Sequence, residues 1–221
     1  MRPFFSPLQL ALFLFILGGL LLMLQLQLFS IAFERLGLSQ QSAFLLLISS
    51  LLGSMINLPL FSVRSELPSE PLPLPLRRLL RMPQLPFTGR TIIAVNIGGC
   101  LIPLSFSVYL LTHSPLPLTD ALLATALVST VSYAFSRPIA GLGVAMPILI
   151  APVSAALVAV TINPAESPPL AYICGTLGVL IGADLLRLKD IRQLGTPIAS
   201  IGGAGTFDGI FMTGIVAVLL A

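Results

Sequence analysis

The chain has 221 residues, of which 56% are hydrophobic and only 9% are charged, and its mean hydropathy is +1.04. Water-soluble domains usually carry about 25% charged residues, so this composition excludes a water-soluble fold. The net charge of +3 does not indicate nucleic-acid binding, because the basic residues lie in short segments between apolar runs and lack the interleaved aromatic residues on which bases stack. We therefore expect one integral membrane domain in the cell (inner or plasma) membrane, in contact with the lipid bilayer and without a nucleic-acid partner.

Apolar runs that are long enough to cross a hydrocarbon layer of about 30 Å recur along the whole chain. Their approximate limits are 4–31, 42–63, 91–111, 119–136, 139–162, 169–186 and 197–220. These runs predict an all-α, polytopic bundle of about seven transmembrane helices, in which most sequence neighbours are antiparallel. A re-entrant segment is the alternative for 139–162, because glycine and proline are frequent between Gly141 and Pro152.

Lysine and arginine are distributed unevenly between the connections of this predicted bundle. Cytoplasmic loops collect these residues, whereas exported loops have few of them. With the amino end in the cytoplasm, the exported side keeps only Arg35. The cytoplasmic side receives Arg2, Arg64, Arg77, Arg78, Arg81, Arg90, Arg137, Arg187, Lys189 and Arg192. This positive-inside distribution predicts an amino terminus inside and a carboxyl terminus outside.

The longest predicted connection, 64–90, combines repeated Leu-Pro pairs with five arginines. Alternating leucine and proline favour an extended, polyproline-like backbone. We interpret the connection first as a positively charged cytoplasmic loop that fixes the orientation of the protein. The alternative is that Arg77, Arg78 and Arg81 contact anionic lipids of the inner leaflet.

Two aspartates, Asp184 and Asp208, fall inside the sixth and seventh predicted spans. A charged residue at the centre of a span costs about 2.5–3.5 kcal/mol on insertion scales, so each is a candidate functional group. Counting inward from the outer helix ends at about 1.5 Å per residue places both carboxylates about 20 Å deep. We expect them to face each other, with Gly178 and Gly182 allowing the two helices to approach closely.

Further residues near this predicted inner depth would complete a pocket that opens to the cytoplasm, either through polar side chains or, for the glycines, through backbone N–H groups. They are Asn96, Ser132, Tyr133, Arg137, Gly203 and Gly205. Arg137 is a candidate counter-ion for either aspartate, and the glycine run from Gly202 allows backbone N–H groups to approach a ligand. The alternative is structural: Asp184 pairs with Arg187 one turn later, and Asp208 caps the start of a short final helix.

The two cysteines, Cys100 and Cys174, lie within apolar runs. Their spacing fits neither a metal site nor a disulfide framework nor a redox motif. We expect both to be reduced packing residues, and we predict neither a cofactor nor a metal ion.

The segments Ala171–Leu185 and Ile201–Phe211 contain the most distinctive sequence of the chain, including Ile181-Gly182-Ala183-Asp184 and Gly205-Thr206-Phe207-Asp208-Gly209. They resemble a prokaryotic family of polytopic membrane proteins known as domain of unknown function 1614. The resemblance covers most of the chain. It implies a small multi-pass membrane protein and brings no activity with it.

The aspartate pair also gives a looser resemblance to the intramembrane aspartyl proteases, which place two aspartates on separate helices near the cytoplasmic side. This resemblance implies that Asp184 and Asp208 are catalytic, one carboxyl group holding a proton while the other activates water. The chain departs from the Gly-x-Gly-Asp motif of those enzymes, since Ile181-Gly182-Ala183 precedes the first aspartate and Gly205-Thr206-Phe207 precedes the second. Their Pro-Ala-Leu motif is also absent.

Three functions therefore stay open at the level of sequence. The first interpretation, a peptide-cleaving membrane enzyme that resembles the intramembrane aspartyl proteases, requires that the two carboxylates lie close together. A transporter or channel for a small solute, a cation or protons requires a polar path to the exported side. A non-catalytic scaffold or assembly protein requires neither.

Overall fold

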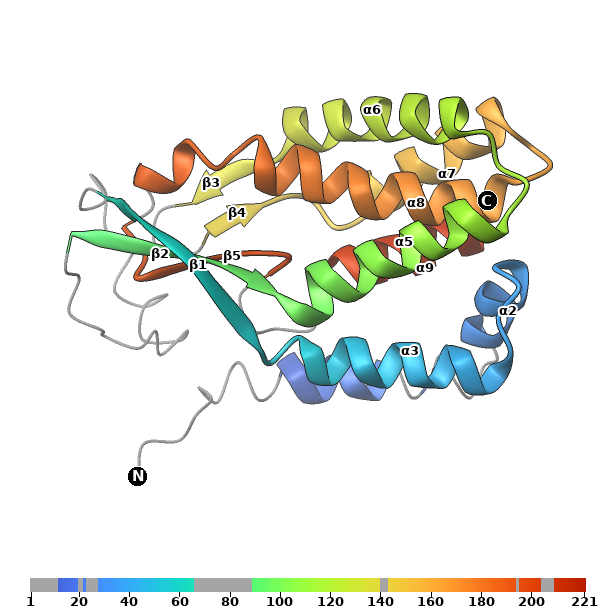
Figure 1. Ribbon diagram of the computed structural model, residues 1–221, viewed down its shortest axis with the longest axis horizontal. Coiled ribbons are helices and arrows are strands. Elements are labelled where there is room, and N and C mark those ends of the chain that lie inside the picture. Colours follow the sequence, from blue (N-terminus) through green and yellow to red (C-terminus); the bar gives the residue numbers. More distant parts are fainter. Residues whose placement is uncertain are drawn as a thin grey trace.

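The computed structural model describes residues 12–19, 22, 28–65, 89–139, 143–193, 195–203 and 209–221. Its helices form a bundle, and its strands lie together beyond one end of that bundle (Figure 1). Besides helical residues 12–19, the α-helices are α2 (Leu28–Arg35), α3 (Gln40–Gly53), α5 (Ile102–His113), α6 (Leu118–Phe135), α7 (Ile150–Ile162), α8 (Ser167–Val179) and α9 (Gly209–Leu220). The strands are β1 (Asn57–Arg64), β2 (Arg90–Asn96), β3 (Arg137–Ile139), β4 (Gly143–Ala145) and β5 (Ile198–Ile201). The π-helical turns η1 (Ile97–Leu101) and η2 (Leu180–Leu185) and the 3-10 turn η3 (Asp190–Gln193) complete the order of described elements.

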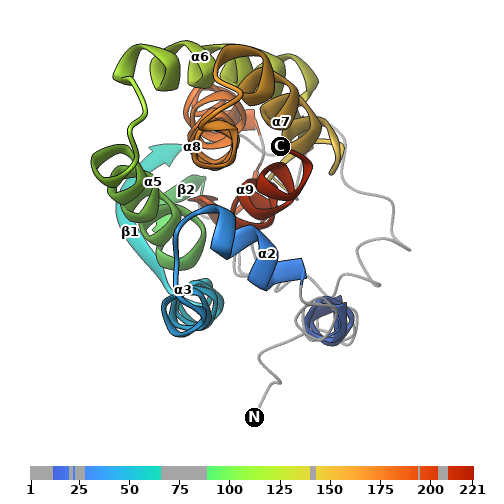
Figure 2. The same ribbon diagram turned by 90° about the vertical axis from the view of Figure 1, so that its right-hand side faces the viewer.

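Helix α8 forms the centre of the bundle. Viewed end-on, it is surrounded by α5, α6, α7 and α9 (Figure 2). Its residues from Leu170 to Cys174 are fully buried, and the ring of Tyr172 packs edge-on against Phe106 of α5 with 4.9 Å between the ring centroids. A helix that is apolar on all sides is a buried helix, so the sequence of α8 accounts for its central place.

Glycine allows α6 and α8 to pack at short range. A Cβ atom added at Gly178 would lie 2.6 Å from Val128 Cγ1, and one added at Gly182 would lie 2.8 Å from Ser132 Cβ. The predicted place of this glycine pair, in the contact between the last two spans, is wrong, because the helix against which both glycines pack is α6.

The described chain contains two helical segments that are long and apolar enough to cross a membrane. They are Leu118–Phe135 and Ser167–Leu185, and the pair formed by α2 and α3 makes a third candidate, although it is bent by 106°. The predicted run 119–136 therefore coincides with one straight helix, α6. At about 1.5 Å per residue, its 18 residues extend for about 27 Å, close to the thickness of a hydrocarbon core.

The expectation of an all-α fold needs correction, because several predicted spans change to strand. Predicted span 42–63 ends in β1, 91–111 begins in β2, 139–162 begins in the β3–β4 hairpin, and 197–220 begins in β5. Hydropathy does not distinguish an apolar strand from an apolar helix of the same length. Local chemistry explains the outcome: Pro59 is unfavourable in a helix interior, and β-branched residues dominate Thr91–Val95. The number of seven membrane helices stays a prediction.

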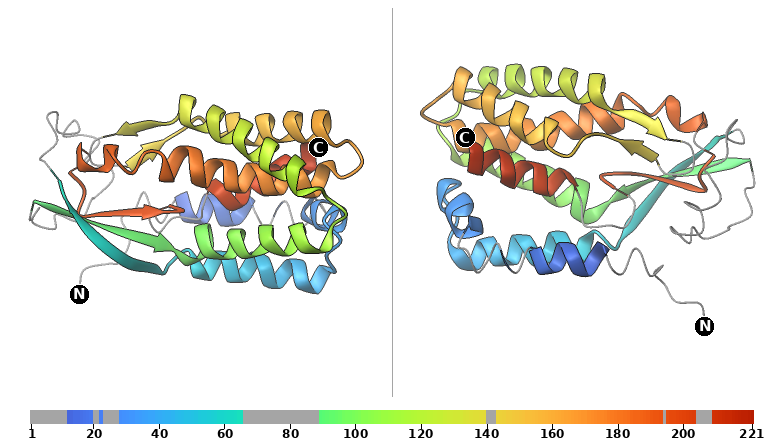
Figure 3. Two further views of the ribbon diagram at one scale, coloured as in Figure 1. Left: turned by 45° about the horizontal axis from the view of Figure 1, so that its top comes forward. Right: turned by 180° about the vertical axis from the view of Figure 1, so that it is seen from behind.

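Strands β1, β2 and β5 form one sheet in that order. The central strand β2 is antiparallel to β1 and parallel to β5. Strands β3 and β4 form a separate hairpin at the same end of the bundle (Figure 3). A second hydrophobic core lies where the sheet meets the helices, apart from the core between the helices. Its buried members are Ile93, Cys100, Ala151, Val179, Leu180, Ala183, Ile191, Ile201 and Ile210.

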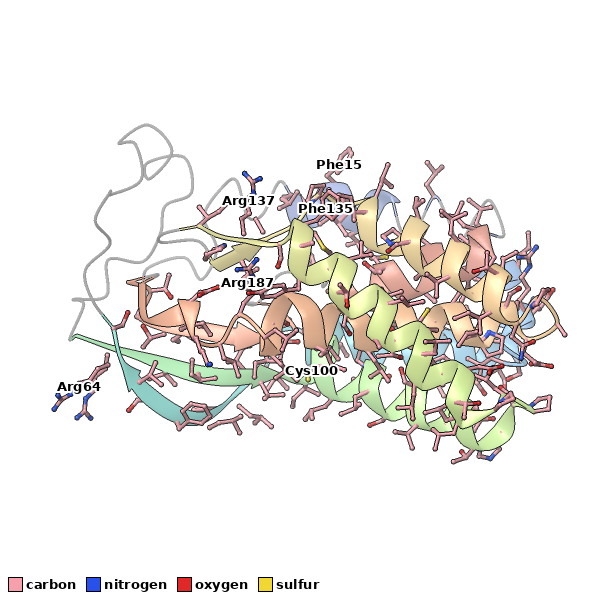
Figure 4. The ribbon with its side chains drawn as sticks, turned by 90° about the horizontal axis from the view of Figure 1, so that it is seen from above. Phe15, Arg64, Cys100, Phe135, Arg137 and Arg187 are labelled. Carbon is pink, nitrogen blue, oxygen red and sulfur yellow. The ribbon has the colours of Figure 1, made fainter. Side chains whose placement is uncertain are left out.

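The two ends of the molecule carry different groups. At the end away from the sheet, Arg35 donates to the carbonyl oxygen of Val218 at 3.2 Å. The hydroxyl of Ser167 donates to the carbonyl oxygen of Ala221 at 3.3 Å. At the sheet end, Arg64 lies farthest from the helices, and Arg137 and Arg187 lie nearer to them (Figure 4). The positive-inside distribution and the direction of insertion stay predictions. Residues 66–88, with Arg77, Arg78 and Arg81, lie outside the described part.

Candidate functional site

Asp184 lies in the π-helical turn that ends helix α8. Its side chain is half-buried, and its Oδ2 atom accepts a hydrogen bond of 2.7 Å from the backbone N–H of Gly202. Gly202 follows strand β5 and has φ = +84°, and Gly203 has φ = +94°. Only glycine adopts these left-handed conformations without a steric penalty. The bond therefore ties the carboxyl end of α8 to a glycine turn that directly follows the sheet.

Asn96 ends strand β2 and caps the start of the other π-helical turn, η1. Its Oδ1 atom accepts from the N–H of Gly99 at 2.8 Å, and its Nδ2 atom donates to Ser54 O at 2.7 Å and to Asn57 Oδ1 at 3.1 Å. Ser200 Oγ donates to the same Asn57 oxygen at 2.5 Å. The buried amide thus uses three of its four hydrogen-bonding positions to join α3, β1 and η1. Asn96 therefore holds these elements together, and its predicted role in a binding pocket stays a prediction.

The two π-helical turns meet across Gly202. A Cβ atom at Gly202 would lie 2.7 Å from the carbonyl carbon of Gly99 and 2.7 Å from the nitrogen of Cys100. The contacts therefore run from Asp184 through Gly202 and Gly99 to Asn96, and we call these four residues the π-junction. π-Helical turns are rare and occur often at functional sites, which makes the π-junction the candidate site.

Three of the pocket residues that the sequence predicts lie in or beside the π-junction. Asn96 and Asp184 belong to it, and Gly203 follows it directly along the chain. Ser132 is fully buried on α6 and faces η2, where it contacts Gly182. Its hydroxyl has no hydrogen-bond partner in the described part of the protein. The roles of these residues stay predictions.

Tyr133 and Arg137 lie elsewhere. Tyr133 is exposed and stacks under the guanidinium of Arg187, and Arg137 is exposed in strand β3. Within the described residues, Arg137 forms no ion pair with Asp184. The structure therefore does not form the predicted pair of Arg137 with Asp184, and a pair of Arg137 with Asp208 stays a prediction. Asp208 and Gly205, the remaining predicted site residues, lie outside the described residues.

Arg187 has a structural role that was not predicted from the sequence. Its NH2 group donates to the carbonyl oxygens of Tyr133 and Ser136, both at 2.8 Å, and its NH1 group forms an ion pair of 3.0 Å with Asp190. These bonds satisfy carbonyl groups at the end of α6, which has no further helical turn to accept them. The alternative in which Asp184 pairs with Arg187 is wrong, since Arg187 pairs with Asp190. An arginine three residues before an aspartate was the available signal.

The described residues contain no group of three or more histidine, cysteine, aspartate or glutamate side chains that could hold a metal ion. Cys100 and Cys174 are both buried. Cys174 lies on α8, where its sulfur is 3.7 Å from the carbonyl oxygen of Ala155. Among the described residues, the chemistry available at the π-junction is therefore that of the Asp184 carboxylate, the Asn96 amide, backbone N–H groups and nearby hydroxyl groups.

Residues 51–220 match the model of the family DUF1614, which is described as proteins of unknown function. Because the match covers well over half of the chain, the chain belongs to this family. It includes the whole π-junction. No curated protein and no solved structure matches the chain.

Proposed function

We propose that this member of the DUF1614 family is an integral membrane protein that transports a cation or protons, with Asp184 as the group that binds the transported ion. The membrane location is supported by the two segments of sufficient length, Leu118–Phe135 and Ser167–Leu185. It is also supported by the outer face of α6, where Leu118, Leu122 and Leu123 are more than half exposed. Leucines exposed in this way suit contact with lipid chains.

The observation that carries the proposal is the position of Asp184 where regular helices are interrupted. Helix α8 changes to a π-helical turn at Leu180, and helix α5 is reached from strand β2 through another π-helical turn. Transporters bind ions at such discontinuous segments, because backbone groups freed from regular helical bonds become available there. One carboxylate oxygen of Asp184 is held by Gly202. The other has no hydrogen bond within the described residues and is the proposed ligand for a proton or cation.

A row of hydroxyl groups on α6 supports transport over a purely structural role. Thr125, Ser129 and Ser132 are buried on this helix, and the last two contact Gly178 and Gly182 of the central segment. Neither serine hydroxyl has a hydrogen-bond partner among the described residues. A buried hydroxyl without a partner is costly unless water or a ligand reaches it. We infer that this row gives water or an ion a polar path along the contact between α6 and α8.

The test is an ion-flux assay with the purified full chain in liposomes. A pH-sensitive dye inside the vesicles reports proton entry after a pH step, and parallel runs impose gradients of sodium or potassium. We expect flux above that of empty liposomes, and loss of that flux in Asp184→Asn. The matched control is Asp120→Asn, which changes an aspartate at the opposite end, where Asp120 accepts from Asn163 at 3.0 Å. The proposal would be overturned if Asp184→Asn gave the same flux as the wild type. It would also be overturned if the wild-type protein gave no flux under the proton, sodium and potassium gradients.

Peptide cleavage is the second candidate function, and one observation favours it. The bond from Gly202 fastens Asp184 to the segment that contains Asp208 six residues later. An aspartyl protease requires both acids. The discriminating experiment incubates the reconstituted protein with membrane-spanning peptides and identifies products by mass spectrometry. Cleavage that disappears in both Asp184→Asn and Asp208→Asn would replace the transport proposal, whereas an intact peptide pool would exclude proteolysis of those peptides.

A further inference from the structure

The sheet has two arginines placed directly opposite each other. Arg64 of β1 and Arg90 of β2 are partners in the antiparallel register, and both are exposed. Like charges in directly opposite positions destabilise a pair of strands. Among the described residues, neither arginine has an ion-pair partner. An anion that binds both guanidinium groups would remove this repulsion.

The same face of the sheet becomes apolar toward the helices. Residues two positions apart on a strand share a face, so Ile92 lies on the face of Arg90. Ile92 pairs with Ile198 of β5, and these isoleucines are 41% and 45% exposed. The face therefore has a basic end away from the helices and an apolar end next to them. A surface of this kind matches the order of headgroups and acyl chains in a membrane.

The length of the chain places the arginine pair near the headgroups. Helix α3 has 14 residues and β1 has 8, which correspond to about 21 Å of helix and about 26 Å of strand. The sum is an upper limit, since β1 slants relative to α3 (Figure 1). A bilayer with its headgroup layers measures about 40–45 Å. A protein that spans it from the outer end of α3 thus brings Arg64 to the level of the inner headgroups.

Strand pairing with a second copy does not explain the exposed edge of β1. Pro59 has no N–H group to donate, and the register shifts between Pro59 and Phe61. Proline and bulges on an edge strand prevent the addition of another strand. The exposed apolar residues Met55, Ile56 and Leu58 instead continue the exposed side of α3 into the strand. This continuity favours lipid as the neighbour of the sheet.

We propose that Arg64 and Arg90 together bind the phosphate group of an anionic phospholipid in the inner leaflet, while Ile92 and Ile198 contact its acyl chains. The inference rests on the membrane location in the proposed function but not on ion transport. Each arginine at an anionic membrane surface should enrich the anionic lipid locally by about fivefold.

The chain has no tryptophan, so one introduced tryptophan gives an unambiguous signal. Ile198→Trp places it in the proposed lipid contact. Ser62 is the cross-strand partner of Ile92, so Ser62→Trp provides a second reporter. The full-length protein is reconstituted in phosphatidylcholine vesicles that contain either brominated phosphatidylglycerol or brominated phosphatidylcholine at the same mole fraction. Bromine quenches tryptophan on contact. We expect quenching by the anionic lipid to be at least about twofold stronger, and to become equal after Arg64→Gln with Arg90→Gln.

Two controls separate this site from general attraction of anionic lipid. Replacement of Arg137 and Lys189 by glutamine removes two charges from the same end of the protein and should leave the ratio unchanged. A tryptophan at Leu122 on the lipid side of α6 should show no preference. Equal quenching by both lipids in the parent reporters, or an unchanged ratio in the double arginine variant, would overturn the proposal. No quenching by either lipid would show that the sheet does not lie at the membrane surface, and this would also overturn the proposal. Failure of the transport proposal would appear separately, in the flux assay.

Discussion

The carboxylate of Asp184 accepts a hydrogen bond of 2.7 Å from the backbone N–H of Gly202, eighteen residues later in the chain. This bond joins the central helical segment to the turn that precedes α9. It also gives Asp184 a structural contact that is independent of any function in ion binding. A substitution at this position therefore has to distinguish loss of the contact from loss of charge.

Asp184→Asn and Asp184→Ala make that distinction. Asparagine retains an oxygen that can accept from Gly202, so we expect the thermal midpoint in detergent to stay near that of the wild type. Alanine leaves the N–H of Gly202 without its partner, and an unsatisfied buried donor costs about 1–3 kcal/mol. Heating followed by size-exclusion chromatography measures the fraction that stays monodisperse. Equal midpoints for the two variants would show that the bond contributes little, and both variants should lack flux.

Gly202→Ala should destabilise the protein more than an ordinary glycine substitution. A left-handed conformation costs a non-glycine residue about 1–2 kcal/mol, and here the added Cβ would also lie 2.7 Å from Gly99 and Cys100. The matched control is Gly37→Ala, since Gly37 has φ = +73° with no atom within 4 Å of the added Cβ. The difference between the two thermal midpoints measures the contact at the π-junction. A smaller loss for Gly202→Ala than for Gly37→Ala would mean that η1 and β5 are not packed as described.

Arg187→Lys should lower stability by about 1–3 kcal/mol despite its retained charge. A lysine has no planar group that can reach Tyr133 O and Ser136 O while it also pairs with Asp190. The control is the reverse exchange, Lys189→Arg, at an exposed position two residues later, for which no loss of stability is expected. Thermal midpoints of the purified variants give the comparison. An unaltered midpoint in Arg187→Lys would show that capping of α6 does not depend on the guanidinium.

The sequence predicted α6 almost completely, because this segment has no proline or glycine and forms one uninterrupted apolar helix. It did not predict β1, because Leu58, Leu60 and Phe61 raise hydropathy equally in a strand and in a helix. For the site, the sequence grouped Asn96 with Asp184, and the structure brings both to the π-junction, whereas their depth in a membrane stays a prediction. The means of contact was not predictable, since it depends on tertiary packing of glycine backbones.

The predicted membrane orientation can be tested with single cysteines. Ala221 lies beside Ser167 at the end of the bundle opposite Arg64. In a Cys100→Ser, Cys174→Ala background, a cysteine at position 221 should react with an impermeant maleimide in intact cells. A cysteine at position 64 should react only after the cells are opened. The reverse pattern would invert the topology, and reaction of both sites in intact cells would show that the two ends are not separated by a membrane.

Ser132→Ala should separate folding from transport. The serine hydroxyl is fully buried and has no hydrogen-bond partner among the described residues, so its removal eliminates an unsatisfied polar group. We expect stability to be unchanged or higher by up to about 1 kcal/mol.

If water or an ion uses this hydroxyl to reach Asp184, flux should fall at least about tenfold, which corresponds to about 1.4 kcal/mol in the transport barrier. Thr130→Ala is the control on the same helix, since Thr130 is exposed and its hydroxyl donates to Ala126 O at 2.8 Å. That variant should transport normally. Wild-type flux in a well-folded Ser132→Ala protein would exclude the contact between α6 and α8 as the path, because a polar route without this serine would have to lie elsewhere in the bundle.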